Sequence, residues 1–257
     1  MKNECMKIFK ISEVSELDKY TIDNEPVTSL DLMERAASLL TRKLLIFFSN
    51  SHIFNILAGT GNNAGDGYAV ARLLNEMELT VKVFDLCPGK QLSPDCAVNR
   101  ELFILDGGTC IEVEKVEDFA PDEGCVIIDA IFGAGLNRPV TGFLGDIIRK
   151  VNELPHRVAA IDIPSGLFGE DNGKNDGAIV EADCTFTFQF PKLAFMFPEN
   201  GKYVGRVEVL DIRLHPDILR ERESPWYYLT EEAVASRLLV PGKFSHKGTL
   251  GNTLLIA

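Results

Sequence analysis

Short apolar runs alternate with amphipathic stretches along most of the chain. Two of the runs, VIIDAIF and VAAIDIP, are almost continuously apolar, which is typical of strands covered on both faces of a parallel sheet. The apolar runs predict strands over residues 53–59, 80–86, 124–133, 157–166, 183–192 and 206–212. Apolar residues spaced by three and four predict helices over residues 12–24, 28–47, 67–77, 94–105 and 142–153. The alternation predicts a Rossmann-like three-layer α/β/α sandwich with a mostly parallel sheet.

Charge and composition restrict the partners of this 257-residue chain. A formal charge of -12 and the absence of a Lys/Arg-rich run disfavour nucleic-acid binding. No run of about 18 apolar residues predicts a membrane span, and the opening MKNECMKIFK lacks the apolar segment of a secretory signal. The six cysteines form no CxxC pair, so we expect reduced thiols in a cytoplasmic protein. These features leave the oligomeric state undetermined, and a homodimer is one option.

The turn after the first predicted strand, GTGNNAGDG, carries two competing interpretations. Gly59, Gly61 and Ala64 match the G-x-G-x-x-A dinucleotide fingerprint, and Asp85 ends the next strand, where a ribose-binding acid is expected. An NAD(P)-dependent dehydrogenase is therefore one alternative. A P-loop is excluded because no Lys-Ser/Thr pair follows the glycines.

The dehydrogenase interpretation leaves Asn62, Asn63 and Asp66 unexplained. Glycines around them permit close approach of a ligand, and backbone N–H groups at a helix start bind phosphate. Two amides and a carboxylate in one turn predict polar recognition of something besides a diphosphate. The simpler alternative is a turn capped by its own Asn and Asp side chains.

Two more turns, DAIFGAGLNR and DIPSG, each begin with an aspartate at the end of a strongly apolar strand. Carboxyl ends of strands in an open α/β sheet share one crevice, so we expect one common site. A desolvated carboxylate is costly unless it binds a cation or takes part in chemistry, although an aspartate that caps a helix or ties a loop is the alternative. Asn63, Asp129 and Ser165 together form an all-oxygen set suited to a hard cation.

The motifs GTGNNAGDG, DAIFGAGLNR and AIDIPSG, in this order, resemble those of the NAD(P)H-hydrate epimerase family, also called the YjeF N-terminal domain. The resemblance covers about residues 7–215 and implies interconversion of the R and S forms of hydrated NADH and NADPH (NADHX and NADPHX). It implies a potassium ion held by Asn63, Asp129 and Ser165. The residues that it implies in substrate binding are Asn62, Asn63, Ala64, Gly65, Asp66, Gly133, Ala134, Gly135, Leu136, Asn137, Arg138, Pro139 and Asp162.

We assign the acid–base chemistry to Asp162, with Lys192 as a second catalytic candidate. Lys192, in QFPKLAF, follows the strand DCTFTFQF and is expected at the mouth of the crevice, where it neutralises a phosphate or assists proton transfer. A solvated loop lysine is the alternative. A nucleotide-binding regulatory or interaction module is the second functional hypothesis, but such a module has little use for an acid at the reacting carbon.

The C-terminal segment predicts a division of the chain. Residues 1–225 are assigned to the epimerase domain, and residues 226–257 to a linker and the truncated start of a second domain. The final KFSHKGTLGNTLLIA resembles the opening of the ribokinase-like, ADP-dependent NAD(P)H-hydrate dehydratase domain, with LLIA as its first strand. The resemblance implies that the parent protein is bifunctional, whereas this chain is not expected to have dehydratase activity.

Overall fold

The computed structural model describes residues 5–238, 240, 242–246 and 248, and internal contacts divide the chain into two units. The larger unit is Phe9–Glu223, and the smaller one combines Met1–Ile8 with Ser224–Ala257. The candidate site residues named above all belong to the larger unit.

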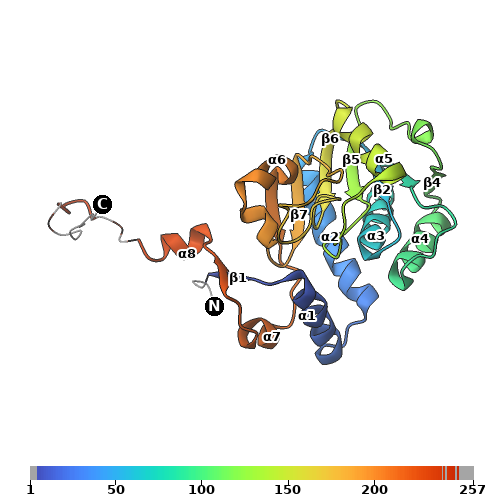
Figure 1. Ribbon diagram of the computed structural model, residues 1–257. Helices are drawn as coiled ribbons and strands as arrows, with labels where there is room; N and C mark the ends of the chain where they lie inside the picture. The colour runs from blue at the N-terminus through green and yellow to red at the C-terminus, as the bar shows by residue number, and fades with distance from the viewer. Residues whose placement is uncertain (1–4, 239, 241, 247, 249–257) are drawn as a thin grey trace. The chain divides into compact units, whose positions relative to one another are not determined.

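A parallel sheet forms the centre of the larger unit (Figure 1), with the strand order β4-β3-β2-β5-β6-β7-β8 in the described part of the chain. The strands are β2 (Ile53–Ala58), β3 (Thr80–Asp85), β4 (Thr109–Glu112), β5 (Val126–Ala130), β6 (Arg157–Ile161), β7 (Cys184–Phe188) and β8 (Arg206–Leu210). The chain adds β3 and β4 on one side of β2 and the later strands on the other. The order therefore reverses between β2 and β5, which is where ligands bind in open α/β sheets.

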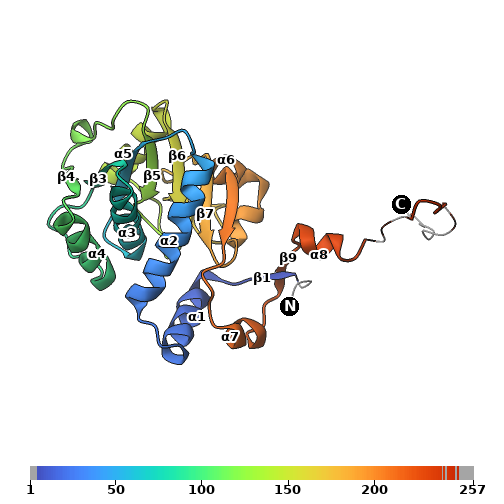
Figure 2. The same cartoon turned by 180° about the vertical axis from the view of Figure 1, so that it is seen from behind.

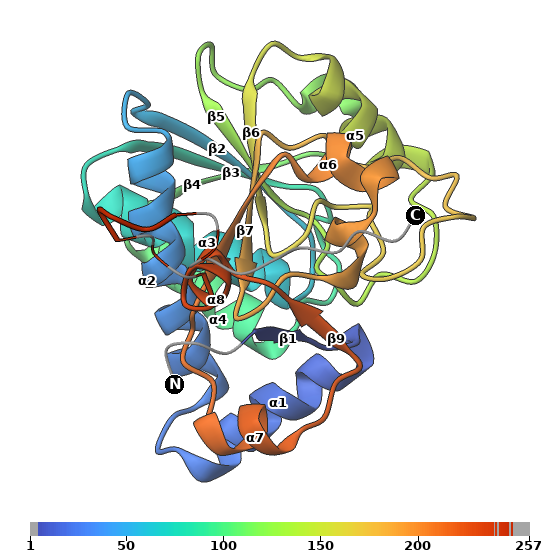
Figure 3. The same ribbon diagram turned by 90° about the vertical axis from the view of Figure 1, so that its left-hand side faces the viewer.

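Helices cover both faces of this sheet. The main ones are α1 (Ile11–Asn24), α2 (Ser29–Phe47), α3 (Asn62–Glu76), α4 (Pro94–Leu105) and α5 (Gly142–Glu153), followed by the short α6 (Gly201–Val204) and α7 (Pro216–Glu221). Figures 2 and 3 show α2, α3 and α4 on one face and α5 on the other. Two separate apolar clusters correspond to these faces, one containing Leu40 and Tyr68, the other Ile147 and Phe119. The predicted three-layer α/β/α sandwich is confirmed.

Local sequence explains where two of these helices begin and how closely one of them packs. Thr28 caps α2 by accepting from the Asp31 backbone N–H, and the Asp31 carboxylate accepts from the Thr28 N–H in return. Pro94 occupies the first turn of α4. Gly67 lets α3 approach β5, because a Cβ there would lie 2.6 Å from the Cβ of Ala130.

Turns after β2 and β5 meet at the reversal of strand order. A Cβ on Gly59 would lie 2.1 Å from the carbonyl oxygen of Ile131, so only glycine permits this contact. The close approach brings the start of α3 beside the loop that follows β5.

Each of the six predicted strands of the sheet is present, and the helices at 94–105 and 142–153 have the predicted bounds. The predicted start of α3 at residue 67 is wrong, because the helix begins at Asn62. Asn62 and Asn63 therefore lie in its first turn and not in a loop. Strand β4 was not predicted, since TCIE is short and only partly buried at the edge of the sheet.

The smaller unit pairs the two ends of the chain. Strand β1 (Met6–Ile8) runs antiparallel to β9 (Trp226–Tyr228), and the hydroxyl of Ser224 donates to the carbonyl oxygen of Ile8. Helix α8 (Glu231–Ala235) follows, capped by Thr230. The strand predicted at LLIA lies outside the described residues, and the assignment of 226–257 to a dehydratase domain stays a prediction. Among the described helices, none has the length and apolar character needed to cross a membrane.

Candidate active site

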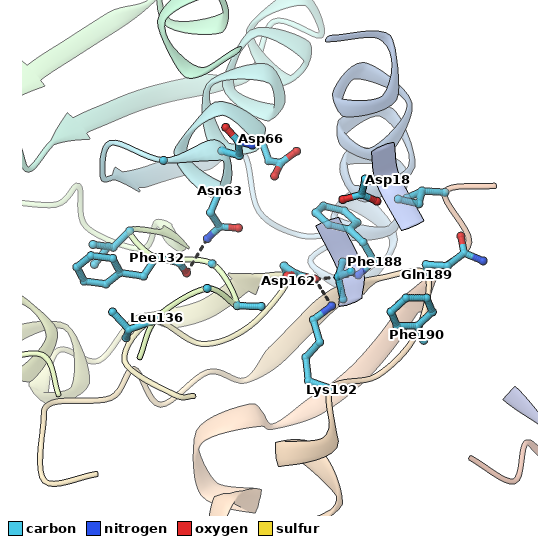
Figure 4. A pocket seen from close by; sticks show the side chains of 18 of the residues that line it. Asp18, Asn63, Asp66, Phe132, Leu136, Asp162, Phe188, Gln189, Phe190 and Lys192 are labelled. Atoms are coloured by element: carbon cyan, nitrogen blue, oxygen red, sulfur yellow. Dashed lines mark hydrogen bonds and ion pairs between the residues drawn. The ribbon is translucent and has the colours of Figure 1, made fainter. Parts of the chain in front are cut away.

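A cavity of about 500 Å³ lies at the carboxyl ends of the central strands (Figure 4). The start of α3, the loop after β5, the residue after β6 and the segment after β7 form its walls. It brings together nine of the predicted site residues, namely Asn62, Asn63, Asp66, Gly133, Ala134, Gly135, Leu136, Asp162 and Lys192.

Other predicted residues lie near the cavity but not on its wall. Ala64 is buried in the apolar cluster under α2 and α4, and the missing Cβ of Gly65 points at Met33 and Cys96. Asn137, Arg138 and Pro139 continue the loop beyond the lining residues, and Asp129 and Ser165 are buried behind it. The roles predicted for these residues in substrate or cation binding stay predictions.

Asp162 and Lys192 form the central polar contact of the cavity. The Lys192 ammonium lies 2.6 Å from Asp162 Oδ1, and the two side chains are 2% and 16% exposed respectively. Asp162 Oδ1 also accepts from the Phe188 backbone N–H at 3.2 Å and the Thr187 hydroxyl at 3.3 Å. These three donors all bond Oδ1, and no described residue donates to Oδ2. The alternative of a solvated loop lysine is wrong, because the Lys192 side chain is buried and paired with Asp162.

The backbone at Asp162 is in the left-handed region, with φ at 64°. Gln189, which follows β7 and also lines the cavity, has φ at 61°. Non-glycine residues seldom adopt this conformation, and such positions gather at functional sites, where surrounding contacts hold them. Here the Asp162 N–H donates to the Phe186 carbonyl at 2.8 Å, which fixes the turn that presents the carboxyl to the cavity.

Asp129, Ser165 and Asn63 are joined by hydrogen bonds through the loop after β5. Asp129 accepts from the Ser165 N–H at 2.7 Å and from the Ser165 hydroxyl at 2.5 Å. The Ser165 hydroxyl in turn accepts from the Phe132 N–H at 2.8 Å, and the Asn63 amide donates to the Phe132 carbonyl at 2.9 Å. The trio predicted to bind a cation is therefore one connected cluster.

The environment of Asp129 fits a cation site. Its side chain is 0% exposed, and no described cationic side chain forms an ion pair with it. Burial raises its pKa to about 6, while the hydrogen bonds from Ser165 and Ile131 work in the opposite direction. An amide oxygen, a hydroxyl, backbone carbonyls and one carboxylate suit a hard monovalent or divalent cation, and no cluster of three His, Cys, Asp or Glu side chains competes among the described residues.

Asp66 is a second buried carboxyl, 9% exposed, on the first turns of α3. Its carboxylate has no hydrogen-bond or ion-pair partner among the described residues, and it lines the cavity. Burial raises its pKa well above the ordinary value, and the charges of Asp162 and Asp18 raise it further. The side chain therefore faces the cavity without a partner among the described residues, and its predicted role in substrate binding stays a prediction.

Sequence reasoning missed several residues of the cavity wall. Val14 and Asp18 come from α1, Phe188 ends β7, and Gln189 and Phe190 follow it. Residues 188–190 fell inside the predicted strand 183–192, whereas the strand ends at Phe188, so the turn that lines the cavity was not expected. For α1 no local signal existed, because its contact with the cavity depends on packing between distant segments.

The likeness to known proteins agrees with this geometry. A family model described as YjeF-related protein N-terminus matches residues 29–194. NAD(P)H-hydrate epimerase of Oenococcus oeni is 37% identical over 203 residues, which cover 77% of this chain and 92% of that protein. The corresponding enzyme of Weissella koreensis is 37% identical over 204 residues, or 79% of this chain and 90% of that protein.

Longer proteins match as well. Bifunctional NAD(P)H-hydrate repair enzyme Nnr of Thermofilum pendens is 32% identical over 257 residues, which cover 98% of this chain but 48% of that protein. A crystal structure of yeast YNL200c superposes with a TM-score of 0.69 at 19% identity, covering 89% of this chain and 98% of that one, which shows the shared fold. From the matched length and the identity together, the chain belongs to the NAD(P)H-hydrate epimerase family and contains the YjeF-related N-terminal domain.

Proposed function

We propose that the chain is an epimerase that interconverts the R and S forms of NADHX and NADPHX. The observation that carries the proposal is the Asp162–Lys192 ion pair inside a cavity bounded by the start of α3 and the loop Gly133–Leu136. The named activity of relatives that the chain matches over most of their length supports it.

Asp162 is the group that we assign to proton transfer. In the hydrated nucleotide a hydroxyl is bonded to the ring carbon next to the ring nitrogen. Protonation of the hydroxyl lets it leave as water, and addition of water to the other face inverts the carbon. Asp162 Oδ2 has no partner among the described residues, so it can exchange this proton while Lys192, Thr187 and the Phe188 N–H hold Oδ1.

The charge of the cavity favours the species formed when the hydroxyl leaves. Asp18, Asp66 and Asp162 line the cavity together with one ammonium group, that of Lys192. Departure of the hydroxyl makes the ring cationic, and acidic side chains fixed around the cavity stabilise developing positive charge. We assign the anionic diphosphate to the N-terminus of α3 at Gly61 and Asn62, where backbone N–H groups are free of helical partners.

Asn63, Asp129 and Ser165 are the residues proposed to hold potassium. Such an ion would neutralise the buried Asp129 carboxylate and fix the loops after β2, β5 and β6 around the substrate. Thermal unfolding in potassium chloride, compared with choline chloride at equal ionic strength, tests this without an activity readout. We expect potassium to raise the unfolding temperature of the parent and not that of Asp129→Ala; no difference in the parent would contradict the ion site.

Further predictions concern the whole protein and its surroundings. Residues 226–257 as the start of a fused dehydratase, a bifunctional parent protein, a cytoplasmic location and a homodimer remain predictions. The full-length match to a repair enzyme twice as long supports the fused arrangement.

The experiment that tests the epimerase proposal uses one purified NADHX epimer. The chain at micromolar concentration is incubated with it, and the ratio of epimers is followed by chromatography against an enzyme-free control. We expect the ratio to reach equilibrium faster than in the control. A time course identical to the control would rule the activity out for this chain.

A further inference from the structure

Helix α1 contributes a carboxyl to the cavity, Asp18, that no sequence motif indicates. Val14 and Asp18 lie one helical turn apart on the same face of α1, and both line the cavity. Figure 4 shows Asp18 on α1, whereas Asp162 extends from the end of β6. The two carboxyls thus reach the same cavity from different walls.

Contacts at both ends of α1 hold Asp18 in this position. At the first turn, the Ile11 N–H donates to Glu170 Oε1 at 2.7 Å. Near the last turn, the hydroxyl of the fully buried Thr21 accepts from the His215 N–H at 3.0 Å. Leu17 is also fully buried beside Asp18. Because these anchors flank Asp18, they hold the part of α1 that carries it against the cavity.

The surroundings of Asp18 do not provide a structural reason for a carboxyl. Its carboxylate has no hydrogen-bond or ion-pair partner among the described residues. Burial, and after it the nearby Asp162 charge, raise its pKa to about 6 against the opposite effect of Lys192. A partly buried carboxyl without a partner costs stability. A side chain that costs stability and faces a binding cavity is typical of a functional residue.

Inversion of one carbon requires proton transfer on two faces of the ring. When the hydroxyl leaves from one face, a group on that face must protonate it. When water adds to the other face, a group there must accept a proton. We propose that Asp18 is the acid–base residue for one face of the substrate ring and that Asp162 serves the opposite face. This inference rests on the proposed epimerase function and adds a catalytic residue to it.

The two half-reactions balance without any further reactant. In one direction the Asp18 carboxyl gives its proton to the hydroxyl, the C–O bond breaks, water leaves, and the electron pair of the ring nitrogen forms a C=N bond. Water then adds to the opposite face, the C=N electrons return to nitrogen, and Asp162 accepts the proton released by the water. The reverse direction exchanges the roles of the two carboxyls.

Oxygen exchange separates the two faces experimentally. Each purified NADHX epimer is incubated separately in H₂¹⁸O with the parent, Asp18→Asn or Asp162→Asn, and mass spectrometry measures ¹⁸O in the epimers after subtraction of the enzyme-free rate. We expect each substitution to slow inversion by about 10²- to 10⁴-fold. Each variant should still exchange the hydroxyl of one epimer without inversion, and the two variants should exchange opposite epimers.

Asp23→Asn is the matched control, because Asp23 is an exposed aspartate on the same helix. It should epimerise at the parent rate. Asp18→Asn turning over within about threefold of the parent would overturn the inference. If folded Asp18→Asn lost inversion but still exchanged the hydroxyl of both epimers, the inference would also be overturned, because Asp18 would then only position the substrate. The same holds if Asp18→Asn and Asp162→Asn exchanged the hydroxyl of the same epimer.

Two further measurements keep the outcomes separable. The parent is assayed in the same series, so an inactive parent counts against the epimerase proposal, whereas an active parent with an active Asp18→Asn variant counts against Asp18 alone. Circular dichroism checks that the variant is folded. Should the asparagine variant fail to fold, Asp18→Ser is assayed in its place with the same expected loss of inversion and the same one-sided exchange.

Discussion

Neighbouring strands β5 and β6 each lead to an aspartate, and the two carboxyls have opposite surroundings. Asp129 is fully buried, accepts hydrogen bonds from Ser165 and the Ile131 N–H, and forms no ion pair with a described cationic side chain. Asp162 lines the cavity and forms an ion pair with Lys192. The same pattern, an aspartate at the end of an apolar run, therefore produces one carboxyl that is buried in hydrogen bonds and one carboxyl that lines the cavity.

Backbone position accounts for the difference. Asp129 lies within β5, paired with Ala160 of β6, so the pleat of the strand directs its side chain. Asp162 is the first residue after β6, and its left-handed φ turns the side chain away from the direction that the strand would impose. One residue beyond the end of a strand is thus enough to change a structural carboxyl into one that reaches the cavity.

The largest expected effect is loss of catalysis in Asp162→Asn. Asparagine tolerates the left-handed backbone and keeps a hydrogen-bond acceptor, but it cannot carry the proton. We expect the enzymatic rate to fall by about 10²- to 10⁴-fold, the usual contribution of general acid–base catalysis. Epimer ratios measured by chromatography, corrected for spontaneous epimerisation, check this. A decrease of less than about threefold would leave Asp162 with a positioning role only.

A double variant separates this catalytic loss from instability. Asp162→Asn leaves the Lys192 ammonium, which is 2% exposed, without its counter-charge, and an uncompensated buried charge is destabilising. Asp162→Asn with Lys192→Met removes both charges. We expect it to regain part of the unfolding free energy lost in the single variant while remaining inactive. Recovery of activity in the double variant would contradict the assignment of proton transfer to Asp162.

Asp129→Asn should have the next largest effect, on folding and not primarily on the chemical step. The new amide NH₂ would face a donor, the Ser165 N–H or hydroxyl, so the buried cluster loses at least one bond. We expect the free energy of unfolding at pH 7.5 to fall by about 2–4 kcal/mol. Urea unfolding measures this loss, provided that the dependence of the unfolding free energy on urea concentration is the same in both chains.

Asp146→Asn provides the reference for that measurement. Asp146 forms an exposed ion pair with Arg149 on α5, and such pairs contribute about 0–1 kcal/mol. A loss of unfolding free energy at Asp129 no larger than that at Asp146 would show that the bonds to Ser165 contribute little to stability. Asp129 would then not differ from an exposed carboxyl in its structural role.

Apolar periodicity was sufficient for the sheet but not for every element that completes the site. Strands such as β5 and β6 are buried on both faces and so carry an unambiguous run of apolar residues. The start of α3 was misplaced because Gly61, Asn62 and Asn63 are residues typical of turns. Tertiary contact with the loop after β5, permitted by Gly59, overrides that local preference.

The site was predictable where residues follow strands and not where packing between distant segments decides. Asp162 and Lys192 follow β6 and β7, so the rule for carboxyl ends of parallel strands places both. Asp18 lies on a mostly polar helix, and its approach to the cavity depends on the bond between Thr21 and His215, 194 residues apart. No spacing within α1 contains that information.

Asp18 also offers a test of stability against pH. Its pKa in the folded chain is raised from 3.8 to about 6, so between these values the folded state holds the proton more tightly than the unfolded state. The stability that this contributes is complete below pH 3.8 and is lost as the pH rises through about 6. Asp18→Asn cannot titrate, so it should become more stable relative to the parent as the pH increases.

We expect this relative gain to be about 1 kcal/mol between pH 4.5 and pH 7.5, since solvent contact of the half-buried side chain reduces the full value of the shift. Urea unfolding of both chains at the two pH values measures it, with the exposed Asp23→Asn as a control that should show no such trend. If Asp18→Asn instead became less stable relative to the parent as the pH rises, the Asp18 carboxylate would be a stabilising group in the folded chain.

The smallest expected effect concerns a hydroxyl that supports Asp162. Thr187 is fully buried, and its hydroxyl lies 3.3 Å from Asp162 Oδ1 and 3.5 Å from the Phe190 carbonyl, so it donates to one of them at a time. Lys192 and the Phe188 N–H remain as donors to Oδ1 when this hydroxyl is removed. Thr187→Val keeps the shape of the side chain, and loss of one long hydrogen bond is worth about 0.5–1 kcal/mol. We therefore expect the epimerisation rate to fall only about two- to fivefold. Thr187→Ser, which retains the hydroxyl, should stay close to the parent. A fall approaching that of Asp162→Asn would instead mean that the hydroxyl, and not the lysine, sets the orientation in which Asp162 meets the substrate.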